Sequence, residues 1–291
     1  MALNGVALRK SPRIMILMKT TLTLVNYLLP ALYFLSAGSY AMAFFQKSLI
    51  ARKAKTHLLT ATILIHLLYL GYRTIAFEHP PITTVFEILS VIALTTALSY
   101  RIIEGLARVK NTGFFVLVIP FLFQLLSTIL IRDLEDVNPV LRSNLLGFHV
   151  MSALLGLSAF AISAVYGFLY LLLYHNIKSS RLGLIYENLP DLEKLERMAT
   201  ISVFSGFVLL TIAIVIGLLW LPKAFADYSY FDPKLLGTVF IWLLYGAGLV
   251  ARLIAGWKGR KIMVLSIAGF AISFLSMTVI NVFLSGFHNF S

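Results

Sequence analysis

The sequence predicts an all-α, polytopic membrane bundle of about eight transmembrane helices, and its composition and apolar runs carry that prediction. Of the 291 residues, 59% are hydrophobic and 12% are charged. Soluble domains have roughly 45–50% apolar and about 25% charged residues, which argues against a water-soluble fold. An outer-membrane barrel would show alternating segments of about ten residues. That pattern is absent from the sequence.

Eight apolar stretches are long enough to cross the hydrocarbon layer, which requires roughly 20 helical residues. They cover residues 22–45, 58–76, 84–102, 114–131, 145–173, 201–221, 235–254 and 262–287. Their short connections leave no room for a soluble domain, so residues 1–291 are predicted to form a single transmembrane domain with a basic tail at 1–20. In the longest connection, Asp191 after Pro190 is expected to cap a short surface helix that leads into the sixth span.

Basic residues gather in alternate loops, which predicts the orientation of the chain. The formal net charge is +12, but its clustering between apolar runs indicates membrane topology and no nucleic-acid partner. The loops after spans one, three, five and seven hold Lys47, Arg52, Lys53, Lys55, Arg101, Arg108, Lys110, Lys178, Arg181, Lys194, Arg197, Lys258, Arg260 and Lys261. The other loops hold Arg132, Arg142, Lys223 and Lys234. We therefore expect a bacterial-type cytoplasmic (inner) membrane with both termini outside, although the basic tail opposes this orientation.

Two patterns within the spans favour structural roles. Arg73 and Glu87 lie about one turn inside the outer ends of the second and third spans, where a short hairpin lets them pair. A lock for that hairpin is favoured over a proton relay. Small residues recur on one face of the fifth span, which favours close helix packing in lipid. They are Ser152, Gly156, Ala159, Ser163 and Gly167.

The chain offers few groups for chemistry. It has no cysteine, which excludes thiol chemistry and thiolate metal sites. Nucleophile and nucleotide-binding motifs are also absent, so no catalytic residue is predicted. Among the histidines, His66 is the mid-span one, where an imidazole needs a hydrogen-bond partner or a metal. His149 opens the fifth span and His288 closes the eighth, both at the outer surface.

His149 and His288 are the candidate metal ligands, and an aromatic loop lies between them in sequence. The loop runs from Phe225 to Lys234. Two imidazoles beside an aromatic shelf suit a flat apolar cofactor with axial nitrogen ligation, for which haem is the candidate. An interfacial structural role and a zinc site with His79 as third ligand remain open. The candidate cofactor-binding residues are His149, His288, Phe225, Tyr228, Tyr230, Phe231, Asp232 and His66.

A series of ordered landmarks runs along roughly residues 58–290. The landmarks are Thr83 to Glu87, Pro120, Phe148 to Val150, Gly206, Leu210, Thr211, Ile214, Gly217, Trp220, Tyr228, Asp232 to Lys234, Trp242 to Tyr245, Arg252, Gly256 to Arg260, Gly269, Phe270, Asn281 and Gly286 to His288. This series resembles the cytochrome c assembly family, which includes CcsA, CcmC and HemX. The order of the landmarks along several spans is more specific than any single motif.

The resemblance implies haem handling at the outer face, where a tryptophan-rich loop and two flanking histidines hold haem in the family. His149 and His288 match those histidines. In the loop, however, Phe225, Ser229 and Phe231 replace the family's tryptophans. Phe and Tyr still stack on a porphyrin, with less area than Trp. The drift is typical of a HemX-like or divergent CcsA-like branch.

The expected function is haem presentation in cytochrome c biogenesis, with an apocytochrome c and a ResB-like membrane protein as expected partners. Enzymatic activity is left open, at most as part of a multi-subunit cytochrome c haem lyase. A HemX-like regulator of tetrapyrrole synthesis is the first alternative. A small-molecule transporter is the second, although the halves show no clear repeat.

Overall fold

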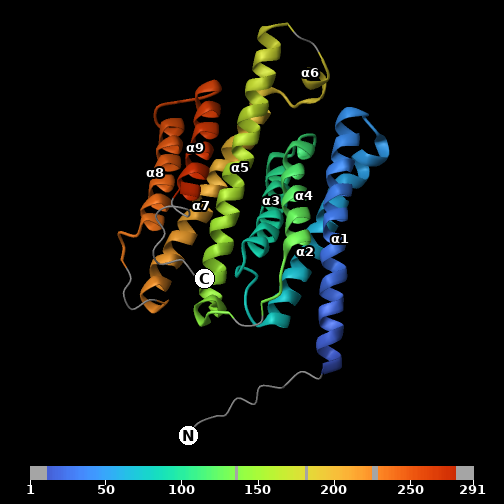
Figure 1. The fold of residues 1–291 in the computed structure, drawn as a ribbon. Coiled ribbons are helices and arrows are strands. Elements are labelled where there is room, and N and C mark those ends of the chain that lie inside the picture. Colours follow the sequence, from blue (N-terminus) through green and yellow to red (C-terminus); the bar gives the residue numbers. More distant parts are fainter. Residues whose placement is uncertain (1–11, 135–136, 181–182, 225–228, 280–291) are drawn as a thin grey trace.

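The protein is a bundle of long helices that run back and forth between two ends of the molecule (Figure 1). The computed structural model describes residues 12–134, 137–180, 183–224 and 229–279. Within these ranges the regular elements are all helical, which confirms the predicted all-α class. Seven of the described helices are long and apolar enough to cross a membrane. The chain is therefore an integral, multi-pass membrane protein.

The long helices coincide with the predicted spans. In chain order the elements are α1 (Pro12–Phe45), α2 (Leu49–Phe77), α3 (Val85–Ala107), α4 (Gly113–Leu130), η1 (Pro139–Arg142), α5 (Asn144–Lys178), α6 (Leu184–Asn188), α7 (Leu192–Ala224), α8 (Pro233–Leu253) and α9 (Arg260–Val279). Helix α1 begins inside the predicted tail. Helix α9 is not among the seven candidate spans, and the predicted eighth span, 262–287, continues past the described residues.

The start of α7 agrees with the predicted cap at Asp191. The Asp191 side chain accepts a hydrogen bond from the Lys194 backbone N–H at 2.8 Å, so it caps a helix as expected. That helix is α7 itself, and the only short helix described in this connection, α6, precedes Pro190. The surface helix expected after Asp191 forms the first turns of α7, which continues into the span without a break. The Lys194 side chain also donates to Asp191 and lowers the pKa of that carboxyl.

Helices α1–α4 form the N-terminal half, and a buried ion pair joins α2 to α3 there. Arg73 Nε and Nη2 both donate to Glu87 Oε1, at 3.1 and 2.8 Å, which confirms the predicted pair. Arg73 Nη1 also donates to Asp133 at 2.9 Å. The second carboxylate oxygen of Glu87 accepts from the backbone and hydroxyl of Thr83. This arrangement holds the α2–α3 hairpin together. Each of the two buried charges has a partner of opposite sign.

Helices α5, α7, α8 and α9 form the C-terminal half, where glycines let backbones approach. A Cβ added at Gly156 of α5 would lie 3.1 Å from the Gly206 carbonyl oxygen of α7. One added at Gly167 of α5 would lie 2.9 Å from the Met263 carbonyl oxygen of α9. Two members of the predicted small-residue face thus contact two different helices, as close packing in lipid requires.

Candidate functional site

A cavity opens between α5, α7, α8 and α9 at the end of the bundle away from the strongly basic loops. Its volume is about 230 Å³. The walls are largely apolar, with a few polar groups at the rim. The lining comprises His149, Ala153, Leu210, Ala213, Ile214, Gly217, Leu218, Trp220, Leu221, Ser229, Asp232, Lys234, Leu235, Gly237, Thr238 and Ser276. An apolar pocket with few converging polar groups is the usual form of a ligand site.

His149 supplies an imidazole to the wall of this cavity, and a hydrogen bond to a backbone carbonyl fixes the tautomer of its ring. Its Nδ1 lies 2.8 Å from the carbonyl oxygen of Ala213. A carbonyl only accepts hydrogen bonds, so Nδ1 carries the proton. In the neutral ring the lone pair is therefore on Nε2. Metal-binding histidines commonly use this arrangement, in which the second ring nitrogen donates to a carbonyl or carboxylate.

The position of the His149 ring depends on Gly217. A Cβ added there would lie 2.8 Å from Cε1 and 2.9 Å from Nδ1 of the imidazole. The ring thus packs directly against the α7 backbone, one turn after the carbonyl that it contacts. Gly217 is required here for close approach, and its absent side chain makes room for the imidazole.

Trp220 joins the end of α7 to the start of α5. Its indole nitrogen donates to Ser143 Oγ at 3.1 Å, and the same hydroxyl caps α5 by accepting from the Leu146 N–H. Because His149 lies in the second turn of α5, this bond fixes the histidine relative to α7. Trp220 therefore lines the cavity and also positions His149.

Asp232 begins α8 beside the cavity. Its side chain accepts from the Lys234 N–H at 2.8 Å, and Pro233 occupies the first helical turn. An Asp N-cap followed by Pro is a strong helix-start signal. Lys234 and Thr238 lie one turn apart on α8 and add an ammonium and a hydroxyl to the rim.

The other loop residues of the predicted site fall into two groups. Tyr230 and Phe231 are 48% and 82% exposed, and the structure places neither in the cavity wall. Phe225, Tyr228 and His288 lie outside the described residues. The structure therefore brings together His149 and Asp232 from the predicted set. It adds Gly217, Trp220, Lys234 and Thr238, of which Thr238 carried no sequence signal.

His66 lies elsewhere, in the interior of the N-terminal half. Its Nδ1 is 2.9 Å from Tyr33 Oη and its Nε2 is 3.0 Å from Ser90 Oγ. The Ser90 hydroxyl donates onward to Gln124, so His66 Nε2 is the donor and Nδ1 accepts from Tyr33. Both ring nitrogens thus have partners, and ligation of a metal would require the loss of one bond.

His79 does not complete a zinc site in the described structure. Its Nδ1 and Nε2 lie 2.9 and 3.1 Å from the carbonyl oxygens of Pro80 and Leu134. No group of three potential metal ligands occurs among the described His, Asp and Glu residues. The contacts place His79 as a link between the α2–α3 hairpin and the segment after α4.

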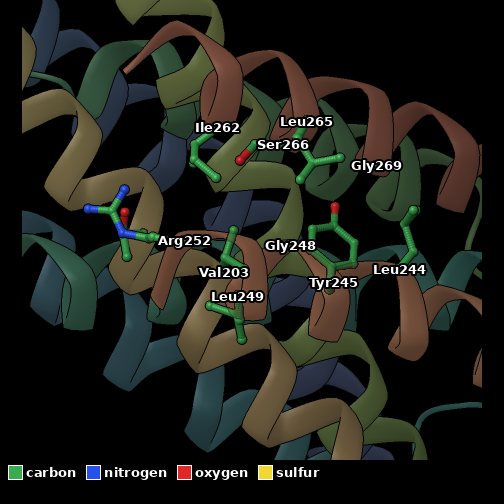
Figure 2. A pocket seen from close by; sticks show the side chains of 11 residues that line it. Val203, Leu244, Tyr245, Gly248, Leu249, Arg252, Ile262, Leu265, Ser266 and Gly269 are labelled. Atoms are coloured by element: carbon green, nitrogen blue, oxygen red, sulfur yellow. The ribbon is translucent and has the colours of Figure 1, made fainter. Parts of the chain in front are cut away.

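A second cavity, between α7, α8 and α9, is too small for an organic cofactor (Figure 2). Its volume is about 30 Å³, enough for one or two water molecules. Figure 2 shows the Tyr245 hydroxyl directed toward α9 near Gly269. A Cβ at Gly269 would lie 3.3 Å from the Tyr245 ring, so this region is closely packed.

Comparison with known proteins agrees with the landmarks along the chain. Residues 24–288 match the model of the cytochrome c assembly protein family. Protein HemX of Bacillus subtilis (strain 168) is 29% identical over 262 residues, covering 89% of this chain and 95% of that protein. The cytochrome c biogenesis protein CcsA of Heterosigma akashiwo (strain NIES-293 / 8280G21-1) is 24% identical over 287 residues, covering 86% and 88%. The CcsA of Guillardia theta is 27% identical over 240 residues, covering 76% and 80%. The family model spans most of the chain and all helices that form the cavity, so this protein belongs to the cytochrome c assembly family.

Proposed function

We propose that the protein acts in cytochrome c biogenesis by binding haem in the cavity between α5, α7, α8 and α9, with His149 as an iron ligand. The hydrogen bond from His149 Nδ1 to the Ala213 carbonyl carries this proposal. It directs the proton away from Nε2 and leaves that nitrogen free to coordinate. Haem would supply the iron and the porphyrin that is to be attached to an acceptor.

The donor set fits haem. Imidazole is a common axial ligand of haem iron, and an apolar surrounding suits the porphyrin face. The wall formed by Ala153, Leu210 and Ile214 provides that surrounding. Lys234 supplies a positive charge at the rim, which suits the carboxylates of such a molecule.

The described cavity forms part of the site. Its volume of about 230 Å³ is below the 300–1,000 Å³ typical of pockets that enclose an organic ligand. The proposed site therefore also includes Phe225, Tyr228 and His288, with Tyr230 and Phe231 as the exposed edge of the aromatic loop. His288 would be the second nitrogen donor.

Attachment of haem would require partners. The chain has no cysteine, so the sulfurs of a thioether link must come from an acceptor such as an apocytochrome c. This chain's residues would bind and orient haem, and any lyase activity would belong to an assembly with a ResB-like membrane protein. The Lys/Arg-poor end, which holds the cavity, would then face outward.

Haem titration of the purified protein in detergent tests the site. We expect the wild type to show a Soret band of bound haem and His149→Ala to bind roughly tenfold or more weakly. His57→Ala is the matched control, because His57 is exposed on α2, and it should bind as the wild type does. Unchanged binding after combined His149→Ala and His288→Ala replacement would exclude this site.

A role as an accessory protein of tetrapyrrole synthesis is the second candidate. The match to HemX over 95% of that protein and the loss of tryptophans at Phe225, Ser229 and Phe231 favour it. Gene deletion separates the candidates. Loss of covalently attached cytochromes c supports assembly, whereas altered porphyrin precursors with normal cytochromes c support the accessory role.

A further inference from the structure

A third cavity lies at the opposite end of the bundle from His149, between the end of α5 and the start of α9. It has a volume of about 370 Å³ and is lined by Leu171, Tyr174, His175, Lys178, Arg260 and Val264. Figure 1 places these two helix ends at the same end of the molecule as the α1–α2 and α3–α4 connections. We propose that this cleft binds an anionic phospholipid, with Lys178 and Arg260 contacting the phosphate.

The charge of the cleft is positive and uncompensated. Lys178 and Arg260 are exposed, and neither forms an ion pair with a carboxylate in the described part of the chain. Glu196 of α7, which contacts the α8–α9 connection, is already occupied. Its two oxygens accept from Arg252 Nη1 at 2.6 Å and from the Gly259 N–H at 2.9 Å. A phosphate in the cleft would therefore meet two free cations without a competing carboxylate.

The floor and surroundings of the cleft are apolar, as a lipid requires and a free phosphate does not. Leu171 and Val264 are the aliphatic residues of its lining, and we call this pair the floor. An exposed apolar face continues from Val264 along α9 through Ile272 and Leu275, which are 40% and 61% exposed. Positions eight and eleven residues after Val264 fall on the same side of a helix. An acyl chain can follow this face while the headgroup remains in the cleft.

The aromatic side chains place the cleft at the depth of lipid headgroups. Tyr174 lines it, and Trp257 is 40% exposed in the preceding connection, with Lys261 Nζ 5.8 Å from the centre of its ring. Trp and Tyr concentrate at membrane interfaces, and basic pockets between transmembrane helices bind anionic headgroups. This inference does not depend on the haem proposal.

Lipid binding to the full-length protein in a neutral detergent tests the cleft, with native mass spectrometry as the readout. We expect phosphatidylglycerol to bind more tightly than phosphatidylcholine, and the Lys178→Gln, Arg260→Gln double variant to bind phosphatidylglycerol about 25-fold more weakly. The matched control is Arg52→Gln with Lys53→Gln, which removes the same charge from exposed positions on α2. It should keep the lipid preference.

Three results would overturn the proposal. They are equal binding of the two lipids, equal loss in both double variants, and full competition by glycerol 3-phosphate, which carries the headgroup charge without acyl chains. Helix content by circular dichroism confirms that each variant is folded. A second variant, Val264→Trp, fills the cleft floor while keeping both cations, and it should also weaken phosphatidylglycerol binding.

Discussion

The N-terminal half of the bundle is joined by a core of buried polar side chains, whereas the C-terminal half combines close backbone contact with hydrogen bonds near the helix ends and the cavity. Helices α1–α4 bury Lys55, His66, Arg73, Glu87, Glu104 and Gln124 among other polar groups. In the described part of α5, α7, α8 and α9 the buried polar side chains are serines, with Asp232 as the one buried charged residue at the start of α8. The haem cavity, the small cavity beside Tyr245 and the basic cleft are all lined by helices of this second half.

The difference indicates that the two halves of the bundle have different roles. Between helices in lipid, association depends on packing and hydrogen bonds, because the lipid tails are as apolar as leucine. Hydrogen bonds such as Tyr33 to His66 specify one arrangement of α1, α2 and α3. Contacts such as Gly156 with Gly206 hold α5 to α7 but leave the remaining space free for a ligand. The first half thus serves as a scaffold, and the second half carries the cavity.

The largest loss of stability is expected from removing the carboxylate of the buried ion pair. Glu87→Ala leaves Arg73 buried, and the side chains of these two residues are 0% and 4% exposed. Arg73 keeps its pair with Asp133, whose side chain is 46% exposed, so the cost approaches the ~3–5 kcal/mol of a buried charge that loses its partner completely. Unfolding in detergent, followed by circular dichroism, measures it. Glu187→Ala is the control, because its pair with Lys47 is exposed and contributes about 0–1 kcal/mol. Equal losses would contradict the scaffold role.

A smaller loss is expected from a methyl group at the α5–α7 contact. Gly156→Ala places Cβ 3.1 Å from backbone atoms of Gly206 and Leu210, so the helices must separate. Overpacking of this kind costs about 1–3 kcal/mol. The control is Gly71→Ala, where nothing lies within 4 Å of the added Cβ. That variant should be as stable as the wild type or slightly more stable in the same unfolding measurement.

Replacing His66 should reduce stability without changing haem affinity. His66→Ala leaves Tyr33 and Ser90 without their buried partner, and an unsatisfied buried group costs about 1–3 kcal/mol. Unfolding and haem titration of the same sample separate the two effects. Loss of haem binding in this variant, with the fold intact, would instead assign His66 to the cofactor.

The smallest effect on stability is expected at Gly217, together with a clear effect on binding. Gly217→Ala introduces a Cβ 2.8 Å from His149 Cε1. The imidazole can relieve this contact by rotating into the open space of the cavity, so the cost in stability is small. We expect about tenfold weaker haem binding, the range found for residues that orient a metal ligand. Gly246→Ala, whose Cβ would meet the Phe207 ring at 3.2 Å, is the control. Equal affinities in the two variants would show that Gly217 does not position the histidine.

Much of the fold was predictable because span length and caps are local properties. The apolar runs locate the long helices, and Asp191 caps a helix in the structure as expected. The Arg73–Glu87 pair was also predictable, because a short hairpin fixes the depth of both residues. The full extent of α7 did not follow from the apolar run alone, since its first turns from Leu192 carry the charged residues that precede the predicted span.

The cavity itself was less predictable, since its lining comes from helices far apart in sequence. His149 and Asp232 carried a signal through their position and the family resemblance. The bond from His149 to the Ala213 carbonyl depends on the rotation of α5 against α7, which periodicity does not give. The contribution of Thr238 depends in the same way on how α8 faces the cavity. The structure also places His66 away from this cavity. Its mid-span position in the sequence did not show whether it belonged to the site.

Trp220 gives the protein an internal optical reporter. The chain has three tryptophans, and Trp220 is the one that lines the proposed haem cavity. Trp242 lies within α8, and Trp257 lies at the opposite end of the bundle. Energy transfer to a porphyrin falls steeply with distance, so emission from Trp220 would be quenched most and that from Trp257 least. Single-tryptophan variants would thus report by fluorescence which end of the molecule a bound porphyrin occupies.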